Sequence, residues 1–214
     1  MKKFESGKIL KIYNNYAELG KAALNPELFS LTQSLEESDF IFSSVHPSLL
    51  AKSPEELKII LNKQRNSFNA EFNFVRKDFL NMNIQKFWGA PSWWPLSFDM
   101  SNQLPEFAGE YMYRKYYSNE NNLWLLKPSN LAHSSGMVLT DSLNLILKNA
   151  EHIKGVNENC IVSKYIDRCL TFRNCKFDMR WVIVIRSFEP LEVYVYKHFW
   201  VRVAKNDFTA DKRR

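Results

Sequence analysis

The sequence predicts a mixed α/β fold. Three observations support this prediction: short apolar runs that alternate with helical patterns, a hydrophobic content of 45%, and an aromatic content of 14%. Alternating strands and helices with short connections are typical of layered α/β proteins. With 24% charged residues and only 6 Gly and 8 Pro among 214 residues, the composition excludes disordered, collagen-like and low-complexity proteins.

The first residues predict a small N-terminal α/β lobe that spans 1–68. An alternating run at 8–16 and an apolar run at 38–45 predict two strands, and residues 17–24 predict a short helix. A second helix is expected to begin after Ser53, because Ser is a preferred N-cap and a proline and two glutamates follow it.

Two further regions follow, a central lobe at 69–165 and the start of a C-terminal lobe at 166–214. The connection at 89–100 is rich in Trp and Pro and is expected to be extended. Thr140 or Asp141 is expected to cap the last helix. The predicted helices are at 53–64, 77–87, 105–117 and 140–152, and the predicted strands are at 123–126, 160–165, 177–186 and 191–203.

The basic excess of the chain lies in its last quarter. Residues 164–214 contain 12 Lys and Arg against 6 Asp and Glu, so the net charge of +6 arises there and the first 163 residues are neutral overall. A basic face attracts nucleotide phosphates, acidic polypeptides or nucleic acid, and composition does not choose among them. The terminal Lys212-Arg213-Arg214 is an alternative source of three of these charges.

The sequence gives no indication of a membrane or a metal. No stretch reaches the roughly 20 apolar residues of a membrane helix, and the start lacks the apolar core of a signal peptide. The three cysteines, Cys160, Cys169 and Cys175, lack metal-site spacing and are expected to be reduced thiols. The expected location is the cytoplasm, with cytoskeletal association and the nucleus as alternatives.

Lys127 is the first candidate site residue. It lies at the end of a predicted buried strand, where Pro128 and a loop of small residues at 129–136 follow. Hydroxyl and backbone N–H groups of such a loop can bind phosphate oxygens. The loop lacks the Walker A pattern, so an ordinary strand end is the alternative interpretation.

A second candidate group opens the strand at 177–186. Side chains alternate across a sheet, so Lys176, Asp178 and Arg180 are expected on one face, and a hairpin would bring Arg202 near them. Such a group can bind ribose or a metal through the aspartate, and phosphates or an acyl phosphate through the cations. The alternative is an exposed salt-bridged edge.

Several segments together resemble the tubulin–tyrosine ligase-like family. The block KFDMRWVIVIRSFEPLEVYVYKHFWVRV at 176–203 is similar to the family's KFDxR…PLxxYxY pattern. LWLLKPSN at 123–130 resembles its WIxKP strand, and RKDFLNMNI at 76–84 resembles its RKDLLxxNI helix. The segments KPSNLA, SKYI and FWVR are most similar to the divergent type-twelve members.

This resemblance implies an ATP-grasp fold in which ATP activates a carboxylate that an amine then attacks. By position, Lys127 is expected to contact the ATP phosphates, Lys164 and Tyr165 to lie at the adenine hinge, and Asp178 to lie near the ribose. By the same resemblance, the phosphates and the substrate carboxylate are assigned to Lys176, Arg180 and Arg202. Tubulin, with its acidic tails, is the implied partner.

The departures from the family's pattern predict a degenerate site. Active members have an Arg or Gln and two glycines in the loop after KP, whereas this loop has His133 and only Gly136, and the hinge Gln is replaced by Ser163. The family's Mg²⁺ ligands, an Asp and a Glu-x-Asn, would follow Arg214, so the C-terminal lobe is expected to be incomplete. No catalytic metal ligand is therefore assigned in this chain.

Two functions follow from these observations. The first is a degenerate ATP-grasp protein that binds tubulin or modulates its tyrosination without ligation, and the chain as given is expected to be inactive. The second is an ATP-dependent ligase that adds an amino acid to a tubulin tail when full length. A nucleic-acid binder rests on charge alone and is not expected.

Overall fold

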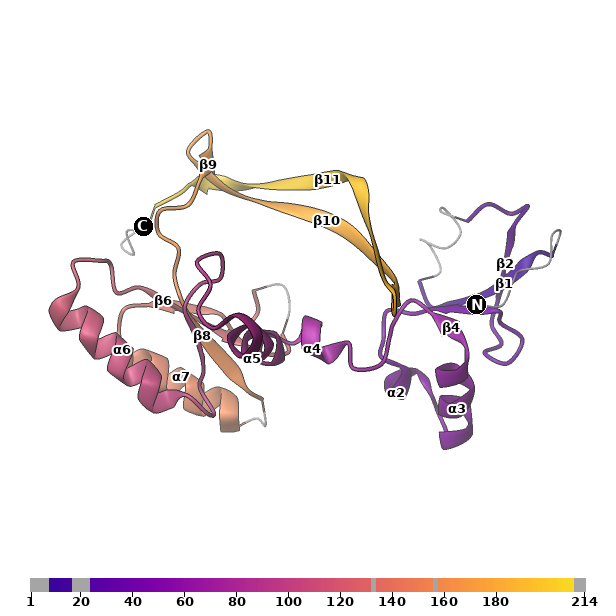
Figure 1. Cartoon of the computed structure of the whole chain (residues 1–214), viewed down its shortest axis with the longest axis horizontal. Helices are drawn as coiled ribbons and strands as arrows, with labels where there is room; N and C mark the ends of the chain where they lie inside the picture. The colour runs from indigo at the N-terminus through magenta and orange to yellow at the C-terminus, as the bar shows by residue number, and fades with distance from the viewer. Residues whose placement is uncertain (1–7, 17–23, 132–133, 156–157, 210–214) are drawn as a thin grey trace. The chain divides into compact units, whose positions relative to one another are not determined.

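The computed structural model describes residues 8–16, 24–131, 134–155 and 158–209. The chain divides into two compact units, Met1–Glu71 and Phe72–Arg214. Strands and helices alternate along the chain (Figure 1), which confirms the predicted mixed α/β class. The finer division into three lobes stays a prediction.

A four-stranded parallel sheet forms the first unit. Its strand order is β2-β1-β3-β4. The strands are β1 (Leu10–Asn14), β2 (Phe29–Thr32), β3 (Phe40–Phe42) and β4 (Gln64–Arg65). β1 and β3 confirm the two predicted strands, whereas β2 and β4 were not predicted because such short runs carry no visible alternation. The predicted helix at 17–24 lies almost wholly outside the described residues.

Among the described residues, two helices accompany this sheet, α2 (Pro47–Leu50) and α3 (Pro54–Asn62). The start of α3 is as predicted: the Ser53 hydroxyl accepts a hydrogen bond of 3.2 Å from the Glu56 N–H. The Glu56 carboxylate in turn accepts from the Lys52 N–H at 2.6 Å. These bonds satisfy donors that a helix start leaves without intrahelical partners.

An antiparallel sheet of four strands forms the centre of the second unit, in the order β5-β8-β6-β7. The strands are β5 (Ser97–Asp99), β6 (Trp124–Pro128), β7 (Val138–Thr140) and β8 (Cys160–Lys164). β6 and β8 confirm predictions. β5 was expected to be part of an extended connection, and β7 was not predicted.

The described part of the second unit has four helices, α4 (Phe72–Val75), α5 (Lys77–Trp88), α6 (Leu104–Tyr117) and α7 (Leu143–Gly155). The last three were predicted within a few residues. The cap of α7 is Ser142, whose hydroxyl accepts from the Leu145 N–H at 3.3 Å. Thr140 was predicted as a cap, but it ends β7 and its hydroxyl accepts from the Ser142 N–H at 3.0 Å.

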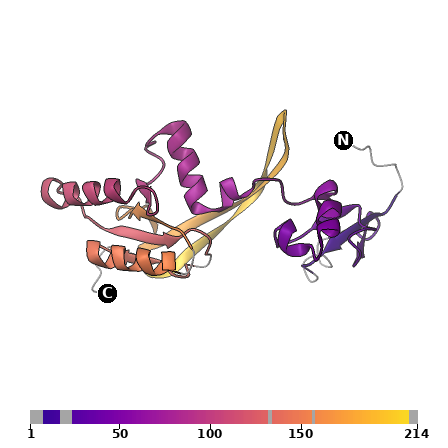
Figure 2. The ribbon, with the colours of Figure 1, turned by 90° about the horizontal axis from the view of Figure 1, so that it is seen from below.

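The core of this unit lies between the sheet and helices α6 and α7. Both helices lie on one side of β6 and β8 (Figures 1 and 2). At the centre, the rings of Phe107 and Trp124 meet edge to face at 5.1 Å, and both side chains are fully buried. The core cluster comprises Phe98, Met100, Phe107, Tyr111, Trp124, Leu126, Ile146, Cys160 and Val162.

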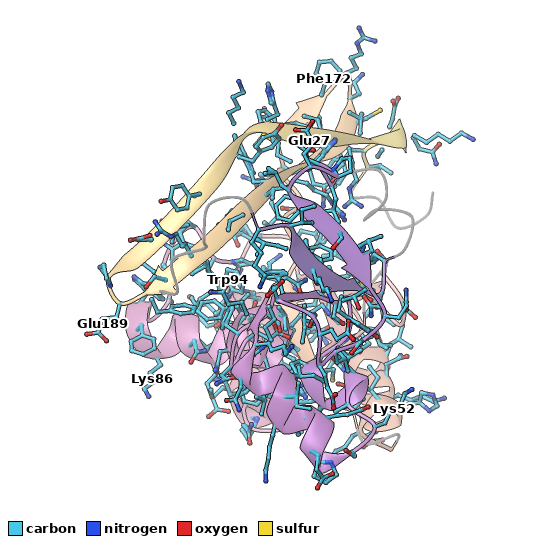
Figure 3. All side chains as sticks on the ribbon, turned by 90° about the vertical axis from the view of Figure 1, so that its right-hand side faces the viewer. Glu27, Lys52, Lys86, Trp94, Phe172 and Glu189 are labelled. Atoms are coloured by element: carbon cyan, nitrogen blue, oxygen red, sulfur yellow. The ribbon has the colours of Figure 1, made fainter. Side chains whose placement is uncertain are left out.

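A long hairpin completes the second unit. It is formed by β10 (Cys175–Phe188) and β11 (Leu191–Asp207), with the short β9 (Thr171–Phe172) on the other edge of β10. Glu189 lies in the hairpin turn (Figure 3). Large apolar side chains of the hairpin are exposed, including Ile183 at 57% and Trp200 at 58%. Within the described residues, no helix has both the length and the apolar character that a bilayer crossing requires.

Truncation of Phe107 tests whether this core governs the stability of the second unit. We expect Phe107→Ala to lower the free energy of unfolding by about 3–5 kcal/mol, because the cavity left in a packed core is not refilled. Urea denaturation followed by tryptophan fluorescence measures this change. Tyr117→Ala is the matched control, since Tyr117 is on the same helix and is 79% exposed. Equal losses in the two variants would contradict this location of the core.

Candidate functional site

Lys127 lies on β6 and is half-buried. Its backbone belongs to the β6–β8 ladder, and within the described residues its ammonium group has no hydrogen-bond partner or counter-ion. Burial, and then the positive charge of Lys77, hold its pKa below the ordinary value of 10.5. A partly desolvated ammonium beside a second ammonium is stabilised by an anion, so this strand end has the electrostatics of an anion-binding site.

Lys77 opens α5 and contacts the segment that follows Lys127. Its Nζ donates to the backbone carbonyls of Leu131 at 2.6 Å, Pro128 at 3.0 Å and Ser129 at 3.4 Å. Sequence reasoning noted this helix but did not assign Lys77 to the site. The sequence signal that could have indicated Lys77 is its position as the second residue of the RKD motif at 76–78.

The Ser129 hydroxyl is a buried group without a hydrogen-bond partner among the described residues. Ser129 as a whole is 1% exposed. An unpaired buried hydroxyl costs about 1–3 kcal/mol, so such groups commonly mark a ligand position. The Lys127 ammonium and the Ser129 hydroxyl can donate to phosphate oxygens and do not suit a metal cation. Lys77 adds positive charge beside them, while its N–H groups donate to backbone carbonyls.

The loop after Lys127 returns to the strand end. Gly136 has a φ of +66°, and a Cβ at this position would lie 2.9 Å from the Pro128 side chain. Glycine is therefore required both for the backbone conformation and for the close approach. The predicted loop residue His133 lies outside the described residues.

Lys164 lies at the end of β8, away from Lys127. Lys164 is paired with Trp124, whereas Lys127 is paired with Ile161, so alternation places the two lysines on opposite faces. The Lys164 ammonium donates to the carbonyl of Asn121. The structure therefore does not bring these two predicted site lysines together.

The Lys164–Tyr165 segment is closely bonded to its neighbours in the sheet. The Lys164 N–H donates to Leu96 O at 2.8 Å, and the Tyr165 N–H donates to Leu123 O at 3.0 Å. The Nζ of Lys176 lies 4.6 Å from the centre of the Tyr165 ring and 3.3 Å from its hydroxyl. Lys176 and Tyr165, both predicted site residues, are thus in contact.

Asp178, Arg180 and Arg202 form an exposed charged group on the hairpin. Asp178 is directly opposite Arg202 and accepts from its Nη2 at 2.6 Å and its Nε at 3.0 Å. Arg180 is more distant, at 3.8 Å from the same carboxylate. The hydrogen bond from Arg202 holds the pKa of Asp178 below its ordinary value. Alternation predicted this grouping, and the exposed salt-bridged edge was its alternative interpretation.

Cysteine and metal chemistry are not indicated by the described residues. They contain no group of three or more His, Cys, Asp or Glu that could hold a metal ion. All three cysteines are free, as expected. Burial raises the pKa of Cys160 to about 11, so this thiol stays protonated and unreactive at neutral pH.

Sequence comparison identifies relatives that are longer than this chain. Human "Tubulin--tyrosine ligase-like protein 12" is 31% identical over 209 residues, which cover 94% of this chain and 31% of that protein. Human "Tubulin polyglutamylase TTLL5" is 28% identical over 167 residues, which cover 76% of this chain and 12% of that protein. The chain thus spans less than a third of the length of either relative.

The structural comparison and the family match support the same fold. The solved structure of D-alanyl-alanine synthetase A from Vibrio cholerae O1 biovar eltor matches with a TM-score of 0.53 and 12% identity, over 94% of this chain and 75% of that chain. Residues 54–213 match the tubulin-tyrosine ligase family. The chain belongs to this family and has its mixed α/β, ATP-grasp-like fold.

Proposed function

We propose that this chain binds ATP phosphates at Lys127 and acts on tubulin by binding it or by modulating its tyrosination, without ligating an amino acid. The observation that carries the nucleotide part is the strand end at Lys127. There Lys77 and Ser129 accompany an ammonium, and the described residues provide neither a counter-ion for this ammonium nor a partner for the Ser129 hydroxyl. Fixed cations in a partly desolvated site favour triphosphate binding.

The remaining site roles in this proposal come from the family resemblance. Lys164 and Tyr165 flank the adenine, and Asp178 lies toward the ribose. Lys176, Arg180 and Arg202 meet the phosphates and the substrate carboxylate. Since Asp178 is paired with Arg202, nucleotide or substrate has to open or share this exposed ion pair. Opening it costs little, because exposed pairs are screened by water and salt.

Ser163 supports the degenerate part of the proposal. It stands where active family members are expected to have a glutamine at the hinge. Ser163 is 2% exposed, and its hydroxyl accepts a 2.8 Å hydrogen bond from the Ser97 hydroxyl across β5 and β8. The Ser163 side chain therefore links two strands of the sheet, and it is too short to reach a nucleotide in the way that a glutamine could.

An ATP-dependent ligase is the second candidate function. It is favoured by the likeness to a relative whose name describes a tubulin polyglutamylase. In that reaction a carboxylate takes the γ-phosphoryl group of ATP and releases ADP, and an amine then displaces phosphate to form the amide. Transfer of labelled glutamate or tyrosine to tubulin, absent with Lys127→Ala, would favour this candidate. We place either activity in the cytoplasm, where tubulin is available.

Substitution of Lys127 tests the phosphate site. We expect Lys127→Ala to weaken ATP binding by roughly 10- to 150-fold, since a hydrogen bond to a charged group contributes about 1.5–3 kcal/mol. Isothermal titration calorimetry measures the dissociation constant. Lys148→Ala removes the same charge from an exposed position on α7 and is expected to leave ATP binding unchanged. An unaltered ATP affinity in Lys127→Ala would refute the assignment.

The lowered pKa of Lys127 predicts a pH dependence of ATP binding. Because the lowered pKa means that the ammonium loses its proton below the ordinary value of 10.5, ATP affinity should decline as the pH rises through the alkaline range toward that value. Phosphate has completed its second ionisation, near pH 6, by the start of this range. Lys127→Arg keeps its charge and should flatten the profile. Parallel profiles for the two proteins would contradict the prediction.

The hairpin cations are expected to bind the acidic tail of tubulin. Arg180→Ala with Arg202→Ala should weaken binding severalfold at low ionic strength, with a smaller difference at high salt, because exposed charges are screened. Fluorescence anisotropy with a labelled tail peptide measures the affinity. Lys197→Ala with Lys205→Ala removes two charges from the same hairpin as a control. If only deletion of Lys212–Arg214 abolishes binding, the hairpin is not the binding surface.

A further inference from the structure

A chain of buried polar contacts begins at Asp78, in the first turn of α5. Asp78 is 7% exposed and accepts hydrogen bonds from Arg76 Nη2 at 2.8 Å, Arg76 Nε at 3.2 Å and the Phe79 N–H at 3.0 Å. Burial alone would raise the pKa of Asp78. The bonds from Arg76, Phe79 and Asn159 outweigh burial and hold its pKa below the ordinary value. The carboxylate is therefore ionised at neutral pH and can accept from more than one donor.

Asn159, which directly precedes β8, links Asp78 to Asp99 through its side-chain amide. Its amide nitrogen donates to Asp78 Oδ2 at 3.2 Å and to Asp99 Oδ1 at 3.0 Å. Its amide oxygen accepts from the Ser101 hydroxyl at 2.6 Å and from the Cys160 N–H at 2.8 Å. Both amide hydrogens and both oxygen lone pairs are used, so the orientation of this side chain is fixed.

The backbone of Asn159 holds the strand end that carries Lys127. Asn159 O accepts from the Ser129 N–H at 2.8 Å. On its other side, Ser129 O accepts from the Lys77 N–H at 3.3 Å. Ser129 is thus held through its donor and its acceptor by residues that Asp78 orders: Asn159 through a side-chain contact, and Lys77 as its neighbour in α5.

We propose that Asp78 and Asn159 are positioning residues, which hold Ser129 and thereby Lys127 in the geometry that receives phosphate; the proposal rests on the proposed nucleotide site. Neither side chain needs to touch the nucleotide. The effect is preorganisation: a strand end that is already ordered loses less entropy when phosphate binds, and its donors do not have to reorient.

Asp78→Asn is the principal test because it keeps the volume of the side chain. The new amide still accepts at one oxygen but presents its own N–H₂ group to donors, so the contact with Asn159 is weakened. Glu106→Gln is the matched control. It makes the same chemical change in the first turn of α6, at an exposed residue, and so reproduces any effect of lost charge on a helix N-terminus.

Two measurements are made on each protein. The first is amide hydrogen exchange resolved by residue with NMR, which compares Ser129 with Leu126 of the preceding strand β6. We expect exchange at Ser129 to accelerate roughly 3- to 10-fold in Asp78→Asn, as loss of one hydrogen bond of typical strength implies, while Leu126 is unchanged. The second is calorimetry with ATP and with adenosine. ATP affinity should fall by a similar factor, and adenosine affinity should stay within about twofold.

Each outcome decides the proposal. Unchanged Ser129 exchange in Asp78→Asn overturns it, whatever ATP does. Equal acceleration at Ser129 and Leu126 also overturns it, because that pattern reports general destabilisation. If the unaltered protein binds no ATP, the proposed nucleotide function fails, and the exchange data still decide the positioning role. If Asp78→Asn does not fold, Ser101→Ala removes one contact of Asn159 from an exposed residue, and undisturbed Ser129 exchange in that variant overturns the proposal.

Discussion

The end of β6 has to accommodate two positive charges in a partly buried place. Lys127 is partly desolvated, and Lys77 lies close enough to lower its pKa further. Two ammonium groups repel each other most where water is scarce. The repulsion is tolerated because Lys77 is solvated by three backbone carbonyls of the segment that it adjoins. The same carbonyls would otherwise need other partners after the strand ends at Pro128.

This arrangement requires the sheet order that the structure has. β8 lies between β5 and β6, so Asn159 at its start can reach both Asp99 of β5 and Ser129 beyond β6. The apolar face of the sheet is covered by α6 and α7, with Trp124 and Phe107 at its centre. Lys127 belongs to the other face, where polar side chains such as Ser97 and Ser163 pair. The two faces of this sheet thus differ: one packs on the apolar core, and the other carries Lys127 and the buried pair Ser97–Ser163.

Sequence patterns predicted those elements whose stabilising contacts are made between residues close together in the chain. Ser53 and Pro54 predicted the start of α3 because the cap is formed by neighbours in the chain. β5 and β7 were not predicted, since each has three residues and acquires its hydrogen bonds only from distant strands.

The candidate site also has a part that local sequence patterns predicted and a part that depends on contacts between distant segments. Alternation along one strand predicted that Asp178 and Arg180 lie together, and the hairpin register then placed Arg202 opposite Asp178. Lys77 was not assigned to the site, because the carbonyls that it contacts are 51–54 residues away in the sequence. The positions of Lys127 and Lys164 on opposite faces follow from the pairing of two strands, and a single sequence does not fix that pairing.

The bonds around Lys164 have a mechanical consequence. The ammonium is tied to the Asn121 carbonyl, and the backbone N–H groups of Lys164 and Tyr165 are tied to Leu96 and Leu123. Hydrogen bonds thus hold the chain up to Tyr165, and no regular structure is present from 166 to 170, where Ile166 and Leu170 are exposed. These five residues connect the antiparallel sheet to the β9–β11 strands, so the contact between Lys176 and Tyr165 links the hairpin to the sheet across this irregular connection.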